Sequence, residues 1–254
     1  MQLSLNGRTL LITGASSGIG AHFAEVAAAA GAKLVLGARR TGRLESVVAA
    51  IKAKGGEAIA VAMDVADKAS TIAAFDAAEA AFGPVDSVIA NAGMGSETPF
   101  LEHSVDEFDQ LMAVNLRGVF LTVQEGARRM MAAGSRERQH GRIVIMSSIT
   151  AQRVDPGLAI YSASKAAVLQ MGKVLAREWA RQGINVNSVL PGYILTEINS
   201  DWFKTEGGQK QMMRFPRKRV MEIDALDPIL LYLASDASKS VTGVGFTIDD
   251  GQSL

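Results

Sequence analysis

Hydrophobic positions along the chain follow two alternating patterns. Short apolar runs, typical of buried strands, are separated by longer stretches in which apolar residues recur at helical spacing. The runs predict strands at residues 9–12, 33–37, 58–63, 85–90, 142–146, 184–189 and 244–248. The periodic stretches predict helices from the glycine-rich turn to residue 30 and at 41–54, 67–82, 104–133, 158–182 and 223–234. This alternation is typical of an α/β fold with a parallel sheet.

Two segments interrupt the pattern. Residues 134–140 are polar and predict a loop. Residues 193–216 mix aromatic, aliphatic and polar residues with a Gly-Gly pair, and such a long excursion in a compact domain often forms a lid or binding loop. Its apolar side chains could cover a hydrophobic substrate, or they could pack on the core or on a partner subunit. We also expect pocket walls from Met94, Gln152, Arg153 and Tyr193.

Composition narrows the possible functions. The 254 residues are 48% hydrophobic and no linker divides them, so we expect one domain over residues 1–254. Lys plus Arg equals Asp plus Glu at 26 each, so the net charge favours neither nucleic acid nor an anionic membrane. The chain has no cysteine and three scattered histidines, so we expect no metal site. The N-terminus lacks the pattern of a secretory signal and no long apolar run occurs, so we expect a soluble, cytoplasmic protein without membrane contact.

A glycine-rich turn follows the first predicted strand and opens the first predicted helix. Gly14, Gly18 and Gly20 would let the backbone approach a pyrophosphate, while the helix N-terminus favours its negative charge. The next strand completes a βαβ unit of about 30 residues. The spacing G-x3-G-x-G differs from the common dinucleotide fingerprint, so a plain tight turn is the alternative.

The second strand ends in Ala38-Arg39-Arg40, at the place where an acidic residue would bind the ribose of NAD. An arginine here can instead pair with the 2′-phosphate of NADP. We therefore predict NADP(H) as the cofactor, in preference to NAD(H). Alternatively, both arginines lie on a solvated face at the start of the next helix.

Small and polar residues follow two later strands. Asp64-Val65 follows the third strand, and Asn91-Ala92-Gly93 follows the fourth. Such residues leave room for a flat ligand at the carboxyl edge of a parallel sheet, where α/β folds bind their ligands. The alternatives are a helix cap for Asp64 and a simple turn for residues 91–93.

Asn115 lies among apolar residues in a predicted helix. An asparagine here is a poor helix former, and if buried it must find hydrogen-bond partners. It could brace a neighbouring strand or hold water near a reactive centre, and the sequence favours bracing.

Tyr161 and Lys165 are four residues apart in a predicted helix, so both can reach one site. A neighbouring ammonium favours the phenolate, which would move the pKa of the tyrosine towards the range useful for proton transfer. In the alternative reading, the tyrosine packs on an ordinary surface helix and the lysine is solvated.

With these residues collected, the chain from Gly7 to Gly251 resembles the short-chain dehydrogenase/reductase family. The resemblance rests on motifs in family order: Thr13-Gly14-x3-Gly18-Ile19-Gly20, Asp64-Val65, Asn91-Ala92-Gly93, Asn115, Ser148, Tyr161-x3-Lys165, Pro191-Gly192 and Thr196. It implies a Rossmann-type doubly wound sheet of seven parallel strands in the order 3-2-1-4-5-6-7, with helices on both faces. The cofactor would bind at the switch point between strands 1 and 4.

The resemblance also implies the catalytic roles. The family's serine lies thirteen residues before the tyrosine, which selects Ser148. Tyr161 would act as general acid and base, and Ser148 would bind the substrate carbonyl. Lys165 would hold the cofactor ribose and lower the pKa of Tyr161, and Asn115 would position a water. The implied cofactor site comprises Gly14, Ser16, Ser17, Gly18, Ile19, Gly20, Arg39, Arg40, Asp64, Val65, Asn91, Ala92, Gly93, Tyr161, Lys165, Pro191, Gly192, Ile194 and Thr196.

The chain departs from the family pattern near its C-terminus. The last strand ends in Asp249-Asp250-Gly251, where relatives usually have Asp-Gly-Gly. We expect this difference to affect subunit packing or the rim of the pocket and to leave the chemistry unchanged.

The expected function is NADP(H)-dependent interconversion of a ketone and a secondary alcohol, on a fairly apolar small molecule, by a homotetramer. One alternative is reduction of a 3-oxoacyl thioester, for which Arg136, Arg138 and Arg177 could dock an acidic acyl carrier. A second is an NADP(H) sensor or scaffold without turnover, against which the intact set of catalytic residues argues.

Overall fold

The computed structural model describes residues 3–96, 98–196 and 200–254. Seven strands form one sheet in the order β3-β2-β1-β4-β5-β6-β7, and every neighbouring pair is parallel. This order confirms the predicted topology. The strands are β1 Thr9–Thr13, β2 Lys33–Ala38, β3 Glu57–Ala62, β4 Ser87–Ala90, β5 Gly141–Met146, β6 Ile184–Pro191 and β7 Gly245–Ile248.

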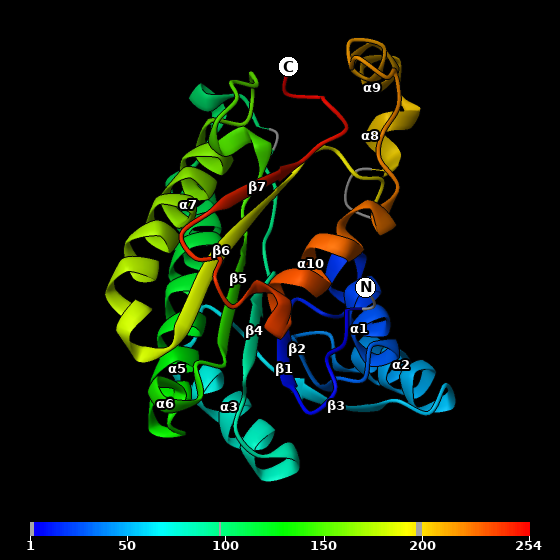
Figure 1. The fold of residues 1–254 in the computed structure, drawn as a ribbon. Helices are drawn as coiled ribbons and strands as arrows, with labels where there is room; N and C mark the ends of the chain where they lie inside the picture. Colours follow the sequence, from blue (N-terminus) through cyan, green and yellow to red (C-terminus); the bar gives the residue numbers. More distant parts are fainter. Residues whose placement is uncertain (1–2, 97, 197–199) are drawn as a thin grey trace.

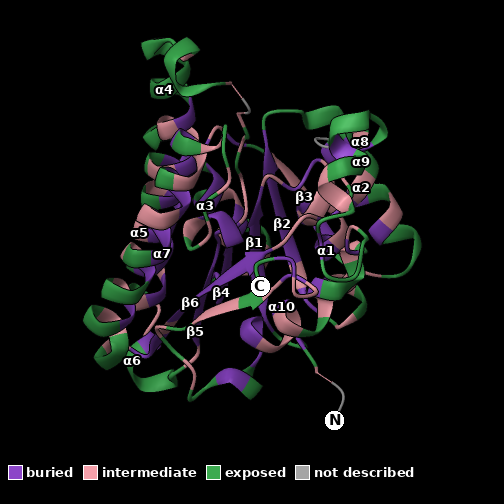
Figure 2. Ribbon diagram, turned by 90° about the horizontal axis from the view of Figure 1, so that it is seen from above, coloured by how far each residue is buried: buried purple, intermediate pink, exposed green. Residues whose placement is uncertain are grey.

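Helices cover both faces of the sheet (Figure 1). One layer contains α1 Gly18–Ala29, α2 Thr41–Ala53 and α10 Asp227–Ala234, and the opposite layer contains α3 Lys68–Phe82, α5 Val119–Ala132 and α7 Ala159–Trp179. In β1, Leu10 and Ile12 join the core on the first side, whereas Leu11 joins the core on the other. Because both faces are covered, the strands are continuous apolar runs. Figure 2 shows the buried strands between helices whose outer surfaces are exposed.

The predicted helix 104–133 is three segments. It begins with α4 Val105–Met112, continues as a π-helical turn Ala113–Gly118 and ends as α5. The predicted capping box of Ser104 and Glu107 is present. Gly118 packs so closely on Val65 that a Cβ at this glycine would lie 2.7 Å from Val65 Cγ2. The π turn buries the Asn115 side chain completely. A π turn within a helix frequently marks a functional site.

Other boundaries differ from the prediction at helix ends. The predicted loop 134–140 contains a short helix, α6 Ser135–Arg138, which follows Gly134 in a left-handed conformation. Short 3-10 turns, Ala180–Gln182 and Ile223–Leu226, follow α7 and precede α10. The segment after β6 contains α8 Ser200–Lys204 and α9 Glu206–Met212. Two further 3-10 turns are Phe100–Glu102 and Asp236–Ser238.

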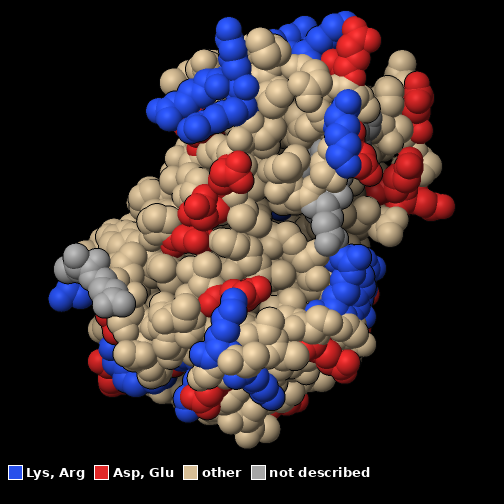
Figure 3. Space-filling view, turned by 90° about the vertical axis from the view of Figure 1, so that its right-hand side faces the viewer, with Lys and Arg blue, Asp and Glu red and all other residues tan. Residues whose placement is uncertain are grey.

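The surface shows no large field of one charge on the face drawn in Figure 3. A group of basic side chains gathers at the upper left of this view, and basic and acidic side chains are interspersed over the rest of it. In the described part of the chain, no helix has both the length and the apolar character needed to cross a membrane.

Candidate active site

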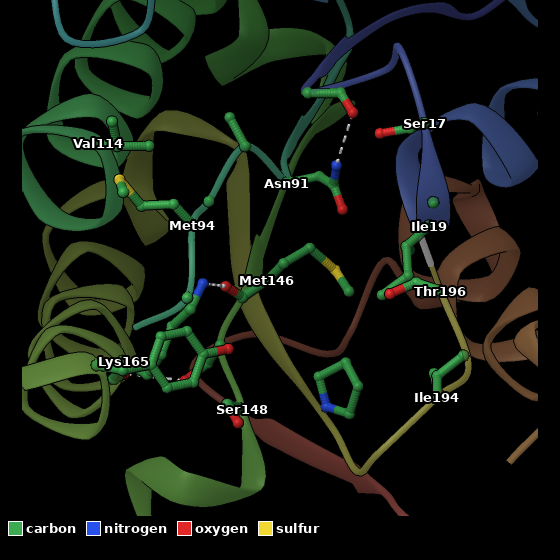
Figure 4. Close-up of a pocket in the computed structure, with 18 of the residues that line it drawn as sticks. Ser17, Ile19, Asn91, Met94, Val114, Met146, Ser148, Lys165, Ile194 and Thr196 are labelled. Atoms are coloured by element: carbon green, nitrogen blue, oxygen red, sulfur yellow. Dashed lines mark hydrogen bonds between the residues drawn. The ribbon is translucent and has the colours of Figure 1, made fainter. Parts of the chain in front are cut away.

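A cavity of about 580 Å³ lies at the carboxyl ends of the strands, at the switch point of the sheet. It extends from the turn after β1 to the residues after β5. Figure 4 shows Ser17, Ile19 and Thr196 on one side and Lys165 and Ser148 on the other. Of the predicted site residues, all but Gly20 and Asn115 line this cavity.

The glycine-rich turn is shaped by close packing. Gly14 and Gly18 have positive φ angles of 67° and 54°. A Cβ at Gly14 would lie 2.8 Å from the Cα of Ala92, and a Cβ at Gly20 would lie 2.6 Å from Asn91 Nδ2. Gly20 therefore packs behind the cavity wall and does not line the cavity. These glycines let the turn lie directly against the end of β4.

Helix α1 begins at this turn. Its N-cap residue, Ser17, makes no side-chain capping bond, and its first turn contains no acidic residue. The first amide groups and the positive end of the helix dipole therefore remain available to a phosphate group.

Two arginines flank the same end of the cavity. The Arg40 guanidinium donates to Ser16 Oγ at 3.0 Å and to Ser17 Oγ at 2.6 Å. Arg39 is exposed and also lines the cavity. Because Arg40 contacts the glycine-rich turn, the reading of a purely solvated helix start is wrong for this residue. Arg39 is exposed, as that reading expects.

Asp64 lines the cavity but does not cap a helix. Its Oδ1 atom accepts a hydrogen bond from the Ala66 amide at 3.0 Å. The cap of α3 is Asp67, whose carboxylate accepts from the amides of Ala69 and Ser70. The helix-cap alternative for Asp64 is therefore wrong.

The ends of β1 and β4 are tied together beside the cavity. Thr13 Oγ1 accepts hydrogen bonds from the amides of Asn91 and Ala92, both at 3.0 Å, and Asn91 Nδ2 donates to the Thr13 carbonyl at 2.9 Å. A Cβ at Gly93 would lie 3.3 Å from Lys165 Nζ. The segment 91–93 is thus more than a simple turn, because it fixes the floor of the cavity.

Tyr161 and Lys165 lie one turn apart on α7, as predicted. Lys165 Nζ lies 5.6 Å from the centre of the Tyr161 ring and donates to the Met146 carbonyl at 3.0 Å (Figure 4). The lysine is 4% exposed, and burial lowers its pKa to about 8. The interpretation of Lys165 as a solvated surface residue is therefore wrong.

The pKa of Tyr161 shifts in the direction opposite to the one expected. Burial of the phenol raises its pKa, and the neighbouring Ser148 hydroxyl only partly opposes this rise. Desolvation disfavours the phenolate, and its effect outweighs the local hydrogen bonding. We expected Lys165 to lower the pKa of Tyr161, but the net shift of this pKa is upward.

Ser148 is held by a residue that the sequence argument missed. Ser148 Oγ accepts from the Thr150 amide at 3.2 Å and from Thr150 Oγ1 at 3.0 Å. Ser147, by contrast, uses its hydroxyl to bond the Lys165 carbonyl at 2.9 Å. This difference agrees with the choice of Ser148. The only sequence signal for Thr150 is its place two residues beyond that serine.

Asn115 lies behind the cavity and braces two segments around it. Its Oδ1 accepts from the Met94 amide at 2.8 Å, and its Nδ2 donates to the Met94 carbonyl at 2.9 Å and to Ser164 Oγ at 3.2 Å. Ser164 Oγ in turn donates to the Tyr161 carbonyl. Asn115 therefore has the bracing role that the sequence favours. The segments it braces are the loop after β4 and helix α7, whereas the prediction was a neighbouring strand.

The predicted lid has its own small aromatic core. Tyr193 stacks on Phe215 with 5.5 Å between ring centroids and meets Phe203 edge-on at 5.8 Å. Phe203 and Phe215 are both buried, so these two rings pack within the lid. Tyr193 and Met94 line the cavity as expected, whereas Gln152 and Arg153 line a smaller neighbouring cavity of about 250 Å³. Residues 197–199 of the predicted lid lie outside the described residues.

The family model described as short chain dehydrogenase matches residues 8–207. The chain belongs to the short-chain dehydrogenase/reductase family. This confirms the resemblance, and oxidoreductase chemistry is the family's common activity.

The most similar short-chain dehydrogenases include enzymes named for sugar or polyol substrates. Gluconate 5-dehydrogenase of Gluconobacter oxydans is 34% identical over 98% of this chain and 95% of that enzyme. D-threitol dehydrogenase of Mycolicibacterium smegmatis is 35% identical over 98% of this chain and 94% of that enzyme. The crystal structure of a gluconate 5-dehydrogenase from Burkholderia cenocepacia, in complex with NADP and tartrate, has a TM-score of 0.92 and 34% identity, covering 99% and 97% of the two chains.

As a short-chain dehydrogenase, the chain presents a cavity that fits a nicotinamide dinucleotide. One end offers free helix amides and two arginines, and glycines keep the turn and the floor clear of side chains. The other end carries the hydroxyls of Ser148 and Tyr161. Among the described residues, no group of three His, Asp or Glu side chains is placed to hold a metal ion.

The basic residues considered for carrier docking lie far from this cavity. Arg136 and Arg138 are on α6, which precedes the first residue of β5, and Arg177 is near the end of α7, which precedes β6. These positions are at the amino edge of the sheet, whereas Ser148 follows the carboxyl end of β5 (Figure 1). Arg138 also forms an ion pair with Asp86 at 3.3 Å. They do not form a docking face beside the site.

Proposed function

We propose that this short-chain dehydrogenase interconverts a ketone and a secondary alcohol with NADP(H) as the hydride carrier. One observation carries the proposal: a single cavity joins the anion-binding turn after β1 to Ser148, Tyr161 and Lys165. When bound, the nicotinamide ring supplies or accepts the hydride. The protein contributes binding, orientation and proton transfer.

Tyr161 is the proton donor in ketone reduction and the proton acceptor in alcohol oxidation. Its raised pKa keeps the phenol protonated near neutral pH, which suits the reductive direction. Ser148 donates a hydrogen bond to the substrate oxygen, where negative charge develops during reduction.

Lys165 orients the cofactor ribose in this proposal. An ammonium has three hydrogen-bond donors, and the side-chain bonds of Lys165 to described residues use one of them, to Met146. The other donors are available to ribose hydroxyls and to a water near Tyr161. The positive charge also opposes the rise in the pKa of Tyr161 that burial causes.

Arg39 and Arg40 support NADP(H) over NAD(H). Both line the cavity beside the turn at which α1 begins, and Arg40 is already oriented by Ser16 and Ser17. A 2′-phosphate here would gain charge-assisted hydrogen bonds from both guanidinium groups.

Two substrate classes remain for the same chemistry. The apolar residues of the lid led us to expect an apolar ketone. Two buried aromatic rings of the lid, Phe203 and Phe215, instead pack on Tyr193, which weakens this expectation. A polyol or sugar is favoured by the polar residues Ser96, Thr150 and Tyr193 in the cavity wall and by the names of the relatives. A carrier-bound thioester is disfavoured because its candidate docking residues lie at the opposite edge of the sheet.

The proposal is tested by initial rates with both cofactors and a panel of substrates. The panel comprises a bulky cyclic ketone and a 3-oxoacyl thioester with NADPH or NADH, and gluconate and threitol with NADP⁺ or NAD⁺. We expect turnover of a free ketone or a polyol, and a higher kcat/KM with the phosphorylated cofactor. Fast turnover of the thioester alone would contradict the substrate class. Tight NADPH binding without turnover of a wide panel would favour the sensor alternative.

We propose one domain over residues 1–254, with 193–216 as the substrate lid, assembled as a cytoplasmic homotetramer as the family resemblance implies. Sedimentation of the purified protein tests the assembly, since a monomer would contradict it.

A further inference from the structure

We propose that the C-terminal turn, residues 249–253, positions the substrate side of the active site, and that Gln252 is its central positioning residue. The turn follows β7 at the carboxyl edge of the sheet, next to the segments that follow β5 and β6. The kinetic part of this inference rests on the proposed function, whereas the structural part does not.

Gln252 is a buried amide whose two ends both bond to the backbone of one residue of the lid, Tyr193. Its Oε1 accepts from the Tyr193 amide at 2.6 Å, and its Nε2 donates to the Tyr193 carbonyl at 3.2 Å. The side chain is 2% exposed, and a Cβ at Gly192 would lie 2.6 Å from Oε1. The amide therefore fixes the backbone of Tyr193 much as a neighbouring strand would.

These bonds belong to a closed ring of interactions. The Tyr193 hydroxyl donates to Asp155 at 3.3 Å, Asp155 pairs with Arg153 at 3.4 Å, and Arg153 donates back to the Gln252 carbonyl. The ring joins the segments after β5, β6 and β7. Burial and the Asp155 carboxylate raise the pKa of Tyr193 to about 12, so its hydroxyl stays a donor over the range of ordinary assays.

The turn itself is built to hold this shape. The Asp249 carboxylate accepts from the Gly251 amide at 3.0 Å and from the Ser253 amide at 2.8 Å. Asp250 has a positive φ of 54°, which aspartate tolerates better than most residues. Its carboxylate pairs with Arg217 at 3.0 Å and with Arg219 at 2.8 Å. The departure from the usual Asp-Gly-Gly thus adds an ionic link to residues 217–219, which directly follow the lid.

The ring adjoins the walls that would contact substrate. Tyr193 lines the cavity, and Thr150 and Leu158 line it from the segment that carries Arg153 and Asp155. The anion-binding end, with Ser16 and Arg40, lies across the cavity on the other side of the switch point. Loosening the ring should therefore weaken substrate binding much more than cofactor binding.

The test compares three variants, at positions 250 and 252 of the C-terminal turn and at residue 254 just beyond it. Gln252→Met keeps the length of the side chain but removes both amide bonds. Asp250→Gly removes the two ion pairs and suits the positive φ, so it tests the link to the segment that follows the lid without strain in the turn. Leu254→Ala is the control, because this side chain is fully exposed.

For Gln252→Met we expect KM for the substrate to rise at least about fivefold, with kcat and the Kd of NADPH changed less than about twofold. Asp250→Gly should raise KM in the same direction by a smaller factor, and Leu254→Ala should match the wild type. An unchanged KM in Gln252→Met, or an equal rise in the Kd of NADPH, would overturn the proposal.

Hydrogen exchange gives a readout that needs no turnover. The Tyr193 amide should exchange at least about tenfold faster in Gln252→Met, since it loses its acceptor, whereas the Asn91 amide should not change. If the wild type proves inactive on every substrate but this amide is deprotected as expected, the proposed function fails and the positioning role stands. Unchanged exchange at Tyr193 overturns the positioning role, whatever the activity. If Gln252→Met does not fold, exchange is measured in Asp250→Gly, which keeps the acceptor of the Tyr193 amide but loosens the turn. A smaller rise in exchange at Tyr193 then supports the positioning role, and no rise overturns it.

Discussion

The Ser148 hydroxyl oxygen accepts two hydrogen bonds from Thr150, one from its amide at 3.2 Å and one from its hydroxyl at 3.0 Å. A serine hydroxyl has two acceptor lone pairs and one proton. With both lone pairs engaged by Thr150, the proton of Ser148 is left to bond another group. In the proposed mechanism, Thr150 is therefore a positioning residue that leaves Ser148 to donate to the substrate oxygen.

Replacing Thr150 by valine should reduce kcat for ketone reduction by about tenfold, which corresponds to the loss of one modest hydrogen bond. KM should change little, because the bond to the developing charge matters most in the transition state. Thr150→Ser keeps the hydroxyl and should restore most of kcat. Equal kcat values in the valine and serine variants would show that the Thr150 hydroxyl does not orient Ser148.

Replacing Lys165 by methionine should remove activity and yet stabilise the fold at neutral pH. Burial lowers the pKa of Lys165 to about 8, from an ordinary value of 10.5, so folding at pH 7 carries the cost of a buried charge. The variant should gain about 1–3 kcal/mol in the free energy of unfolding at pH 7, reduced by the lost bond to Met146.

The pH dependence of that gain has a definite sign. Between pH 8 and 10.5 the unfolded chain keeps the lysine proton while the folded protein has released it. Wild-type stability due to this group therefore rises with pH across the window, and the advantage of Lys165→Met should shrink. Chemical denaturation of both proteins at pH 7 and pH 10 measures this. An advantage that grows with pH would contradict the buried, charged state of the lysine.

Cofactor choice should depend on Arg39 and Arg40. Changing either to aspartate should lower the ratio of kcat/KM for NADPH to that for NADH by about 10- to 100-fold, since a charge-assisted bond to the 2′-phosphate is lost. Lys52→Asp makes the same charge change in the last turn of α2, away from the cavity lining. The ratio should remain constant in this control. An unchanged ratio in both arginine variants would remove the reason to assign NADP(H).

Asn115→Asp should destabilise the protein by about 1–3 kcal/mol at pH 7, because a carboxylate cannot donate to the Met94 carbonyl or to Ser164. The buried acid should have a raised pKa, since burial and the facing carbonyl disfavour its charge. The folded state then binds its proton more tightly, so the loss of stability should shrink as the pH falls towards 4. A loss that does not depend on pH would show that the amide does not donate to these groups.

Much of the architecture follows from local pattern. The strands predicted from apolar runs lie in the sheet, because burial on both faces requires just such runs. Tyr161 and Lys165 share a face because helical geometry fixes that relationship. Gly14 and Gly18 adopt positive φ angles, which glycine tolerates better than other residues.

Other features depend on contacts between distant residues and carry no local signal. The π turn at Asn115 adjoins the close packing of Gly118 on Val65, and the sequence predicts a continuous helix there. The direction of the pKa shift of Tyr161 depends on burial, which the Tyr-x3-Lys motif does not report. The role of Gln252 becomes visible only when the segments after three strands meet. The one sequence signal near Gln252 is the unusual Asp249-Asp250-Gly251, which we expected to affect subunit packing or the rim of the pocket.

The most direct test of the whole account is the initial rate of NADPH oxidation by Tyr161→Phe, with the best ketone found for the wild type. Tyr232→Phe is the matched control, because it removes the same phenol oxygen from α10, away from the cavity lining. We expect Tyr161→Phe to lose about 10²- to 10⁴-fold in kcat while still binding NADPH, and Tyr232→Phe to retain wild-type turnover. Wild-type turnover by Tyr161→Phe would contradict the assignment of this tyrosine as the proton donor.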